Sequence, residues 1–246
     1  MARPADPNAR QALIAAARSE FVKHGMAKAR IEDITGACKL SKGAFYLHFE
    51  SKETLFGELV GQLDSQIQKL TLDRHAEYEE CRSRFGLTAG KGRRAVKPEV
   101  LQALSDVDAR YDRASLEVLW QYRDVVDVLM RGCRGTVFDG FIWQYLDTEV
   151  KRIADEVQRM SDYGLCRPDV PAEVAGSMLV GTFIMLARRM ADAEAKPDIE
   201  FWVTALRVLM GEGLIPRSAV TASIAPSNQS AVTSPRSRSH PRRKSR

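Results

Sequence analysis

A nine-residue stretch, Ser41 to Phe49, combines residue types that favour contact with a polyanion. It reads SKGAFYLHF, with Ser41 placed to cap a helix and Lys42 and Gly43 in the first turn. Glycine inside a helix costs about 1 kcal/mol relative to alanine, and a lysine there faces the positive end of the helix dipole. A phosphate would offset both costs, because it neutralises the lysine and reaches the free backbone N–H groups closely at the glycine. The stretch therefore predicts a helix start that binds phosphate.

The sequence on both sides predicts the elements that hold this stretch. Asp6-Pro7 favours a helix start, and apolar residues then recur at helical spacing until Gly25. A second helix of about two turns is predicted from residues spaced i, i+3, i+4 and i+7, namely Ile31, Ile34, Thr35 and Cys38. After the break KLS, Ser41 caps a third helix, and Ser51 caps a long one running toward residue 84. Two short helices between longer ones predict a helix-turn-helix, whose second helix enters the DNA major groove.

The net charge of the chain divides into two unlike regions. The 246 residues carry a formal charge of +5. Residues 217 to 246 contain seven Lys or Arg and no Asp or Glu, so residues 1 to 216 together carry −2. This basic tail is rich in Ser, Pro and Arg, which predicts disorder. It could act as a solubilising extension or as an arm that follows DNA phosphates.

Several classes of protein lack their sequence signals here. The chain has no Gly-rich phosphate loop, no H-E-x-x-H and no G-x-S-x-G motif. Its four cysteines form no C-x-x-C pair, and its four histidines have no ligand-like spacing. We therefore expect no catalytic residues, no metal and no cofactor. Without a long apolar run or a signal sequence, we expect a cytoplasmic protein with no membrane contact, associated with the nucleoid when bound to DNA.

Residues Gly25 to Phe56, GMAKARIEDITGACKLSKGAFYLHFESKETLF, resemble the DNA-binding segment of TetR-type (tetracycline-repressor-like) transcriptional regulators. Ser41 to Leu55 matches the family run S-K-G-x-[FL]-Y-x-H-F-x-[ST]-K-E-x-L. The resemblance covers about residues 8 to 60, and beyond them only an all-helical pattern agrees. It implies an all-α fold with a helix-turn-helix DNA-binding domain over residues 1 to 52. A helical effector-binding and dimerisation domain over 53 to 216 and the disordered tail 217 to 246 would follow.

The resemblance also assigns residues to the DNA. The positions expected to bind it are Arg30, Ser41, Lys42, Gly43, Ala44, Tyr46, His48 and Lys52. Phe45 and Phe49 are expected in the core. For Tyr46 and His48 the alternative is ordinary packing. The chain departs from the family at Ala29 and Arg30, where two threonines are common, and at Lys39, where a small residue is common and glycine would tolerate positive φ.

The rest of the chain is predicted to be helical, over 99–112, 115–131, 136–163, 171–194 and 198–212, after a break at 86–98. The segment AEVAGSMLVGTFIMLARRM is apolar on nearly every face, which predicts burial. In the resembling family the last two long helices pair across a two-fold axis, and the alternative is a core helix within one chain. The resemblance implies a dimer interface that includes Gly176, Met178, Gly181, Phe183, Met185, Trp202 and Leu206.

Aromatic residues in the middle of the chain are candidates for a ligand cavity, because such cavities combine aromatic walls with few polar groups. The candidates are Trp120, Tyr122, Arg123, Phe138, Phe141, Trp143 and Tyr145. The alternative is that these side chains only fill a core.

Two functions are consistent with the sequence. The first is a homodimeric, ligand-responsive regulator, a repressor that binds a palindromic double-stranded DNA operator and is released by a small-molecule effector of unknown identity. The second is a nonspecific or architectural nucleic-acid-binding protein that acts through its basic tail. Binding to a defined palindrome in competition with random DNA would separate them, because a charge-driven binder does not discriminate.

Overall fold

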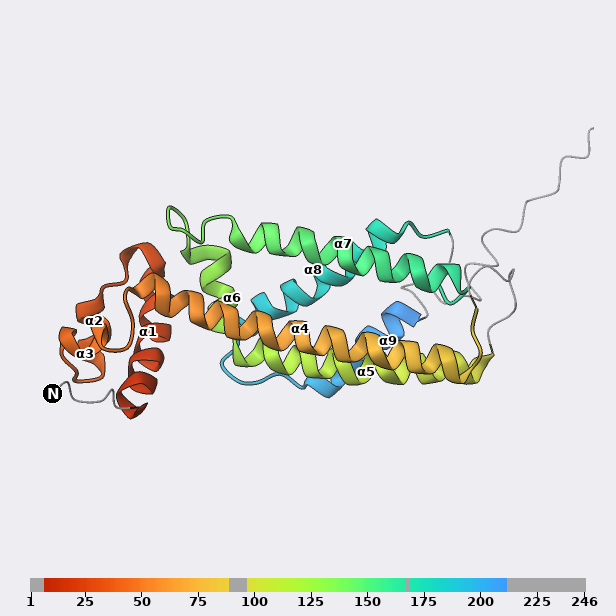
Figure 1. Ribbon diagram of the computed structural model, residues 1–246, viewed down its shortest axis with the longest axis horizontal. Helices are drawn as coiled ribbons and strands as arrows, with labels where there is room; N and C mark the ends of the chain where they lie inside the picture. The colour runs from red at the N-terminus through yellow and green to blue at the C-terminus, as the bar shows by residue number, and fades with distance from the viewer. Residues whose placement is uncertain (1–6, 89–96, 167–168, 212–246) are drawn as a thin grey trace, which may run out of the picture. The chain divides into compact units, whose positions relative to one another are not determined.

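Helices joined by turns make up the computed structural model, which describes residues 7–88, 97–166 and 169–211. In these ranges there is no β-strand, and the predicted all-α fold is confirmed. In chain order the elements are α1 (Pro7–Lys28), α2 (Ile31–Ala37), α3 (Lys42–Tyr46), α4 (Lys52–Arg84), α5 (Pro98–Gln121), α6 (Arg123–Asp127), the π-helix η1 (Val128–Gly132), α7 (Phe141–Asp162), α8 (Ala172–Ala191) and α9 (Ile199–Gly211) (Figure 1). Residues 1–207 belong to one compact unit. The second unit, residues 208–246, is described only over the end of α9, so the predicted basic tail lies outside the described residues.

The predicted starts of α2, α3 and α4 agree with the structure, whereas α3 ends at Tyr46, before the predicted Phe49. The Ser41 Oγ accepts a hydrogen bond from the Ala44 N–H at 3.1 Å, and the Ser51 Oγ accepts one from the Thr54 N–H at 3.0 Å. At Gly25 the backbone leaves the helical region with φ 72 and ψ 164, which interrupts α1. The predicted Asp6 cap lies outside the described residues.

Two predicted boundaries in the second half of the chain are wrong. The expected break between residues 112 and 115 is absent, and α5 runs on to Gln121 before the chain turns at Tyr122. No glycine or further proline follows Pro98 in this helix, so nothing in its sequence stops it. The helix expected from residue 136 begins only at Phe141, because Gly140 has φ 74 and ends the preceding turn in the left-handed region. Residues 89–96 of the predicted break are outside the described ranges.

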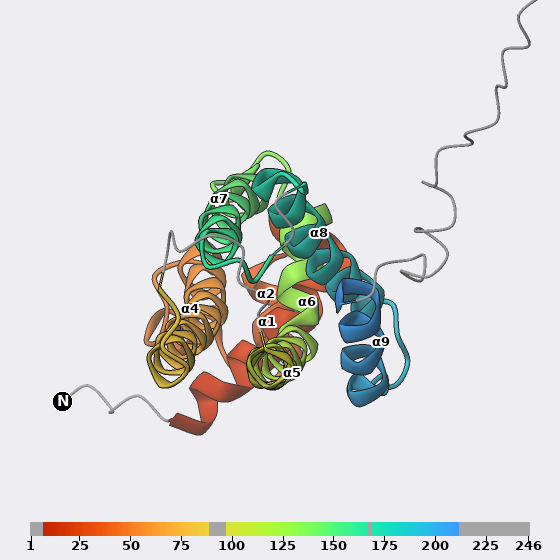
Figure 2. The ribbon, with the colours of Figure 1, turned by 90° about the vertical axis from the view of Figure 1, so that its right-hand side faces the viewer.

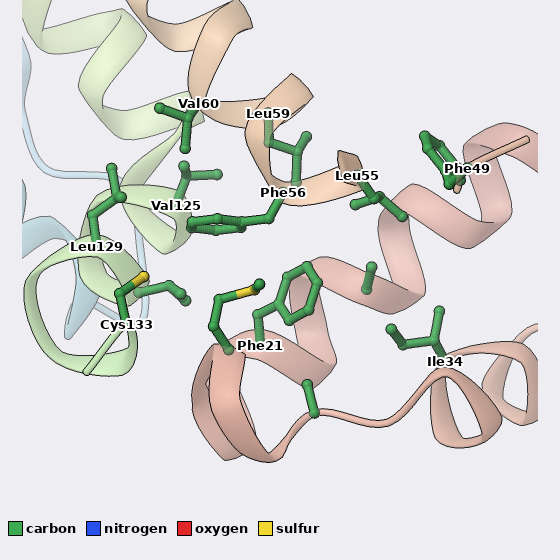
Figure 3. Close-up of a cluster of buried hydrophobic side chains, with 14 of the residues drawn as sticks. Phe21, Ile34, Phe49, Leu55, Phe56, Leu59, Val60, Val125, Leu129 and Cys133 are labelled. Atoms are coloured by element: carbon green, nitrogen blue, oxygen red, sulfur yellow. The ribbon is translucent and has the colours of Figure 1, made fainter. Parts of the chain in front are cut away.

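A single hydrophobic core joins the helix-turn-helix to the middle of the chain. Phe21 from α1 and Phe56 from α4 meet edge to face with their ring centroids 5.4 Å apart. Val125 from α6, Leu129 from η1 and Cys133 pack into the same cluster (Figure 3). The helices that carry the recognition helix are therefore packed directly on α6 and η1.

Helix α8 packs along α7, while α4 packs along α5 (Figure 2). A Cβ added to Gly176 would lie 2.8 Å from the Val150 carbonyl oxygen and 3.1 Å from the Ala154 nitrogen, so this glycine permits the close approach of α8 to α7. The chain itself buries only one face of α8, which disfavours the alternative of a core helix within one chain, and the predicted burial of α8 between two subunits stays a prediction. Val174, Met178 and Met185 are more than half exposed. By length and composition alone α8 could also cross a membrane, a property that core helices share.

Candidate nucleic-acid interface

The recognition helix α3 presents its first residues and one aromatic side chain to solvent. Lys42 and Gly43 are exposed, and Tyr46 is 51% exposed. The side of α3 that faces the protein is closed by Phe45, at 0% exposure, and Phe49, at 3%, as predicted. A helix so short is held in place by this buried face and leaves its N-terminus free to meet a groove.

The backbone at the start of α3 is open to a close contact. A Cβ added to Gly43 would find only the Ser41 Oγ, at 3.7 Å, among the described neighbours within 4 Å. Ser41 is exposed but its hydroxyl is engaged by the Ala44 N–H, and Ala44 is half-buried. The predicted DNA contacts at Ser41, Gly43 and Ala44 would therefore come from the backbone and small side chains.

The turn between α2 and α3 contains a strained residue. Lys39 has φ 57, and no other non-glycine residue of the described ranges has positive φ. The sequence singled out this position because glycine adopts such a conformation more cheaply than lysine. The turn fixes how α3 is set against α2, and the chain forms it with an unfavourable residue.

An ion pair crosses the surface of the helix-turn-helix. The Lys42 Nζ donates a hydrogen bond to the Glu32 Oε1 at 2.7 Å, and the Arg30 Nε lies 3.9 Å from the other Glu32 oxygen. The hydrogen bond to Glu32 raises the pKa of Lys42, and the same bond is the largest cause that lowers the pKa of Glu32. Two of the cations predicted to meet phosphate thus share one carboxylate in the unbound protein.

Two other predicted contacts have partners within the protein. The Lys52 Nζ donates hydrogen bonds to the carbonyl oxygens of Ala29, at 2.8 Å, and Ala27, at 3.2 Å, and its side chain is only 18% exposed. Lys52 therefore fastens the start of α4 to the end of α1. The His48 ring is half-buried, with its centroid 6.4 Å from that of Phe49. Phosphate contact by Lys52 or His48 stays a prediction.

The predicted pocket residues do not gather in one place. Tyr122, Phe138 and Phe141 pack in the core shared with α1 and α4. Trp120 belongs to a second cluster with α8 and α9, and the Arg123 guanidinium lies over its ring at 3.8 Å. Trp143 is 59% exposed, which contradicts its assignment to a buried cavity wall. On helix α7 successive aromatic residues spread around the helix, so sequence neighbours there face different surroundings.

The Tyr145 side chain has a separate environment. Its ring stacks on that of Phe141 with the centroids 6.4 Å apart. The hydroxyl is buried, and the Asp64 carboxylate is the acceptor that faces it. Burial is the largest cause that raises the pKa of Tyr145, and the charges of Glu149 and Asp64 add to it.

The predicted dimer residues divide into two groups. Gly176 packs on α7 of the same chain, and Phe183, Trp202 and Leu206 contribute to a core formed by α5, α8 and α9. These four residues have partners within the chain, and their place in a dimer interface stays a prediction. Met178 and Met185 are each 57% exposed, and a Cβ on Gly181 would meet no described atom within 4 Å.

Sequence reasoning missed several contacts between distant segments. The Arg18 guanidinium donates to both oxygens of Asp124, at 2.6 and 2.5 Å, across 106 positions of the chain. Gly132 lies against Gly25, and a Cβ on Gly132 would be 3.2 Å from the Gly25 Cα. Glu32 was visible as an acidic residue, but its pairing with Lys42 depends on the turn between them. The spacing of apolar residues along the sequence does not show which distant residues pair.

The geometry defines a helix-turn-helix DNA-binding protein, and comparisons with known proteins agree. A family model described as "Bacterial regulatory proteins, tetR family" matches residues 13–59. A probable acrEF/envCD operon repressor of Escherichia coli K12 is 44% identical over 50 residues, which are 20% of this chain and 23% of that protein. The repressor DhaR of Mycobacterium sp. GP1 is 37% identical over 60 residues, 24% of this chain and 30% of that protein. The chain therefore spans less than a third of the length of these curated relatives.

Solved structures extend the likeness of fold to most of the chain. The fatty acid degradation regulator FadR from Bacillus halodurans superposes with a TM-score of 0.56 at 16% identity, over 86% of this chain and 99% of that one. NalD, the secondary repressor of the MexAB-OprM multidrug efflux pump in Pseudomonas aeruginosa, has a TM-score of 0.55 at 20% identity, over 85% and 96%. At these identities the likeness shows the fold alone. Residues 13–59 are therefore similar to the DNA-binding segment of TetR-family regulators, and the fold of most of the chain is similar to that of these solved regulators.

Proposed function

We propose that this regulator is a homodimeric repressor that binds a palindromic DNA operator and leaves it when a small molecule binds the helical body. The observation that carries this proposal is the core shared by α1, α4, α6 and η1. A ligand that displaces α6 would have to move the base of the recognition helix as well, since packed cores shift as units and do not deform smoothly.

Two contacts strengthen this coupling. Gly25 and Gly132 meet backbone to backbone, so neither α1 nor η1 can approach further without a clash. Arg18 ties α1 to the α6 region through Asp124 and through the carbonyl oxygen of Gln121, at 2.7 Å. The π-helical turn of η1 lies at this junction, and such turns occur often at functional sites.

The surroundings of Tyr145 are the best-supported position for the effector. Its hydroxyl is buried and faces Asp64, and a ligand that accepts a hydrogen bond could take the place of this carboxylate. Phe141 supplies an apolar wall by stacking, while Tyr122 is held by the Gln66 Nε2 at 2.9 Å. Structurally similar proteins were solved with stearoyl-CoA, in FadR of Bacillus subtilis, and with triclosan, in SmeT. We infer an effector with a large apolar part and a hydrogen-bond acceptor.

The exposed face of α8 supports dimer formation. Val174, Met178, Gly181 and Met185 follow one stripe of the helix and have no covering element among the described residues. On α9, Phe201 is 67% exposed. Exposed apolar patches of this kind mark interaction sites, and a second copy of the same helices would cover them. A palindromic operator follows from two-fold symmetry.

Genomic mapping with the purified protein, followed by release assays, tests this function. The mapped sites should share an inverted repeat with half-sites about one helical turn apart. Compounds related to the neighbouring genes should release the protein from that site, and Tyr145→Phe should weaken release while leaving DNA affinity unchanged. Sites with no common sequence would favour the architectural alternative, in which the basic tail supplies the affinity.

A further inference from the structure

We propose that Glu32 is a specificity-determining residue of the DNA interface. Its carboxylate holds Lys42 in the unbound protein and lowers the affinity for DNA on which that bond is lost without a replacement. The inference rests on the DNA-binding function of the helix-turn-helix and assigns a role to an acidic residue that faces the polyanion.

The first support is the position of Glu32 between two cations. It lies in the first turn of α2, where its charge is favourable to the helix dipole. Its two oxygens reach Lys42, at 2.7 Å on α3, and Arg30, at 3.9 Å before α2. Both cations were assigned to DNA from their positions, so the acid controls two groups of the interface.

The second support is that the pair has little to do with folding. The side chains of Arg30, Glu32 and Lys42 are 70%, 49% and 53% exposed. Exposed ion pairs contribute little to stability, because solvent screens them and long side chains lose freedom when held together. A role at the surface itself therefore explains the arrangement better than a role in the core.

Lys42 cannot keep its hydrogen bond to Glu32 and also contact a DNA phosphate. If Lys42 keeps its bond to Glu32, the complex loses one phosphate contact and the release of its counterion. If Lys42 moves to a phosphate, the Glu32 carboxylate stays unpaired within a Debye length of the polyanion. Nonspecific binding depends almost wholly on phosphates, so either choice weakens it.

An operator can supply a base amino group that donates a hydrogen bond to Glu32 in place of Lys42. In the major groove the amino groups of cytosine and adenine are donors, and a carboxylate can accept from cytosine N4. When the correct bases lie opposite α2 and α3, Glu32 gains a new donor as Lys42 moves to its phosphate. The penalty then falls on incorrect sequences, which makes Glu32 a discriminating residue.

The test compares Glu32→Gln with Asp33→Asn in the full-length protein. Both remove one negative charge from the first turn of α2, and both residues are exposed. For each variant we would measure the dissociation constants for the mapped operator and for random DNA over a range of salt. Glu32→Gln should tighten random-DNA binding about two- to fivefold and steepen its log–log salt slope by about 0.9. Operator affinity should improve less, so the ratio of the two constants falls.

Two outcomes would overturn the inference. One is an equal change of operator and random-DNA affinity in Glu32→Gln, and the other is an Asp33→Asn variant that lowers the ratio as much. A Lys42→Ala background adds an independent check, because Glu32→Gln should have little effect on the random-DNA affinity there. An undiminished effect in that background also rejects the inference.

The failure of this inference is separable from failure of the proposed function. A parent protein that does not discriminate operator from random DNA rejects both. A discriminating parent whose Glu32→Gln variant keeps the full ratio rejects only the role of Glu32. Thermal stability close to that of the parent, and equal in Glu32→Gln and Asp33→Asn, is expected, because each variant removes one charge from the first turn of α2; such a result confirms that binding is compared between folded proteins.

Discussion

Two exposed surfaces of this chain differ in chemistry, and each difference points to a different partner. The helix-turn-helix surface carries charged side chains, with Arg30 and Lys42 around Glu32 and Tyr46 beside them. The free face of α8 carries Met178 and Met185 and no charge between them. A charged surface can remain in water without a partner, whereas an apolar stripe of this length is costly to expose. The kind of partner therefore depends on the chemistry of the exposed side chains and not on their exposure alone.

The comparison also concerns how the two surfaces depend on each other. One recognition helix contacts one half-site, and two linked half-sites bind far more tightly than one through effective concentration. Loss of the apolar contact should therefore reduce DNA binding more than loss of any single charged contact.

The largest effect is expected from charging the apolar face. Met178→Glu together with Met185→Glu should make the protein monomeric and lower operator affinity about 100-fold or more, because each half-site would then bind alone. Light scattering and operator titration measure the two effects. Val137→Glu is the matched control, since Val137 is 79% exposed but lies outside α8. A double variant that remains dimeric would show that α8 has another partner.

Single changes on the charged surface should have smaller effects. Lys42→Ala and Tyr46→Ala should each weaken operator binding about 10- to 100-fold, with unchanged melting temperature because both side chains are exposed. Leu47→Ala is the control, since Leu47 directly follows α3 and is exposed but was not assigned to DNA. Operator affinities equal to that of the parent would contradict the docking of α3.

Two glycines of α8 separate contacts within the chain from contacts between chains. Gly176→Ala should destabilise folding by about 1–3 kcal/mol, since the new methyl group would lie 2.8 Å from the Val150 carbonyl oxygen. Gly181→Leu should leave a monomer intact but weaken the dimer, because nothing in the described chain fills that position. Thermal melting and sedimentation distinguish these results. A Gly181→Leu dimer as tight as the parent would place the interface elsewhere.

The smallest effect is expected at the turn of the helix-turn-helix. Lys39→Gly should stabilise the protein by about 0.5–1 kcal/mol, because glycine relieves the strain of φ 57 and the gain exceeds its greater loss of backbone freedom. Chemical denaturation measures this change. Lys39→Ala is the control and should give no such gain, so equal stabilisation by alanine would attribute the effect to lost charge.

The sequence was most informative where the structure depends on neighbouring residues. The caps at Ser41 and Ser51, the interruption at Gly25 and the positive φ at Lys39 all follow from local backbone chemistry. Residues 13–59 also match the family model, so the DNA-binding segment could be found without coordinates.

Contacts between distant segments and the exposure of individual helix faces could not be predicted from the sequence. The apolar composition of α8 predicts burial, but composition does not say whether the same chain provides it, and here one face of α8 is exposed. The bond between Arg18 and Asp124 and the contact between Gly25 and Gly132 join segments more than 100 positions apart. The aromatic residues near Trp143 divided between cores and surface, because their directions depend on where α7 begins.

Competition binding tests the central claim most directly. The full-length protein would be titrated onto its mapped operator in the presence of random DNA at physiological salt, and its affinity for each would be compared. A specific regulator predicts a preference for the operator of roughly 10³-fold or more. A ratio near one, with both affinities falling equally steeply with salt, would contradict the account and identify a charge-driven binder.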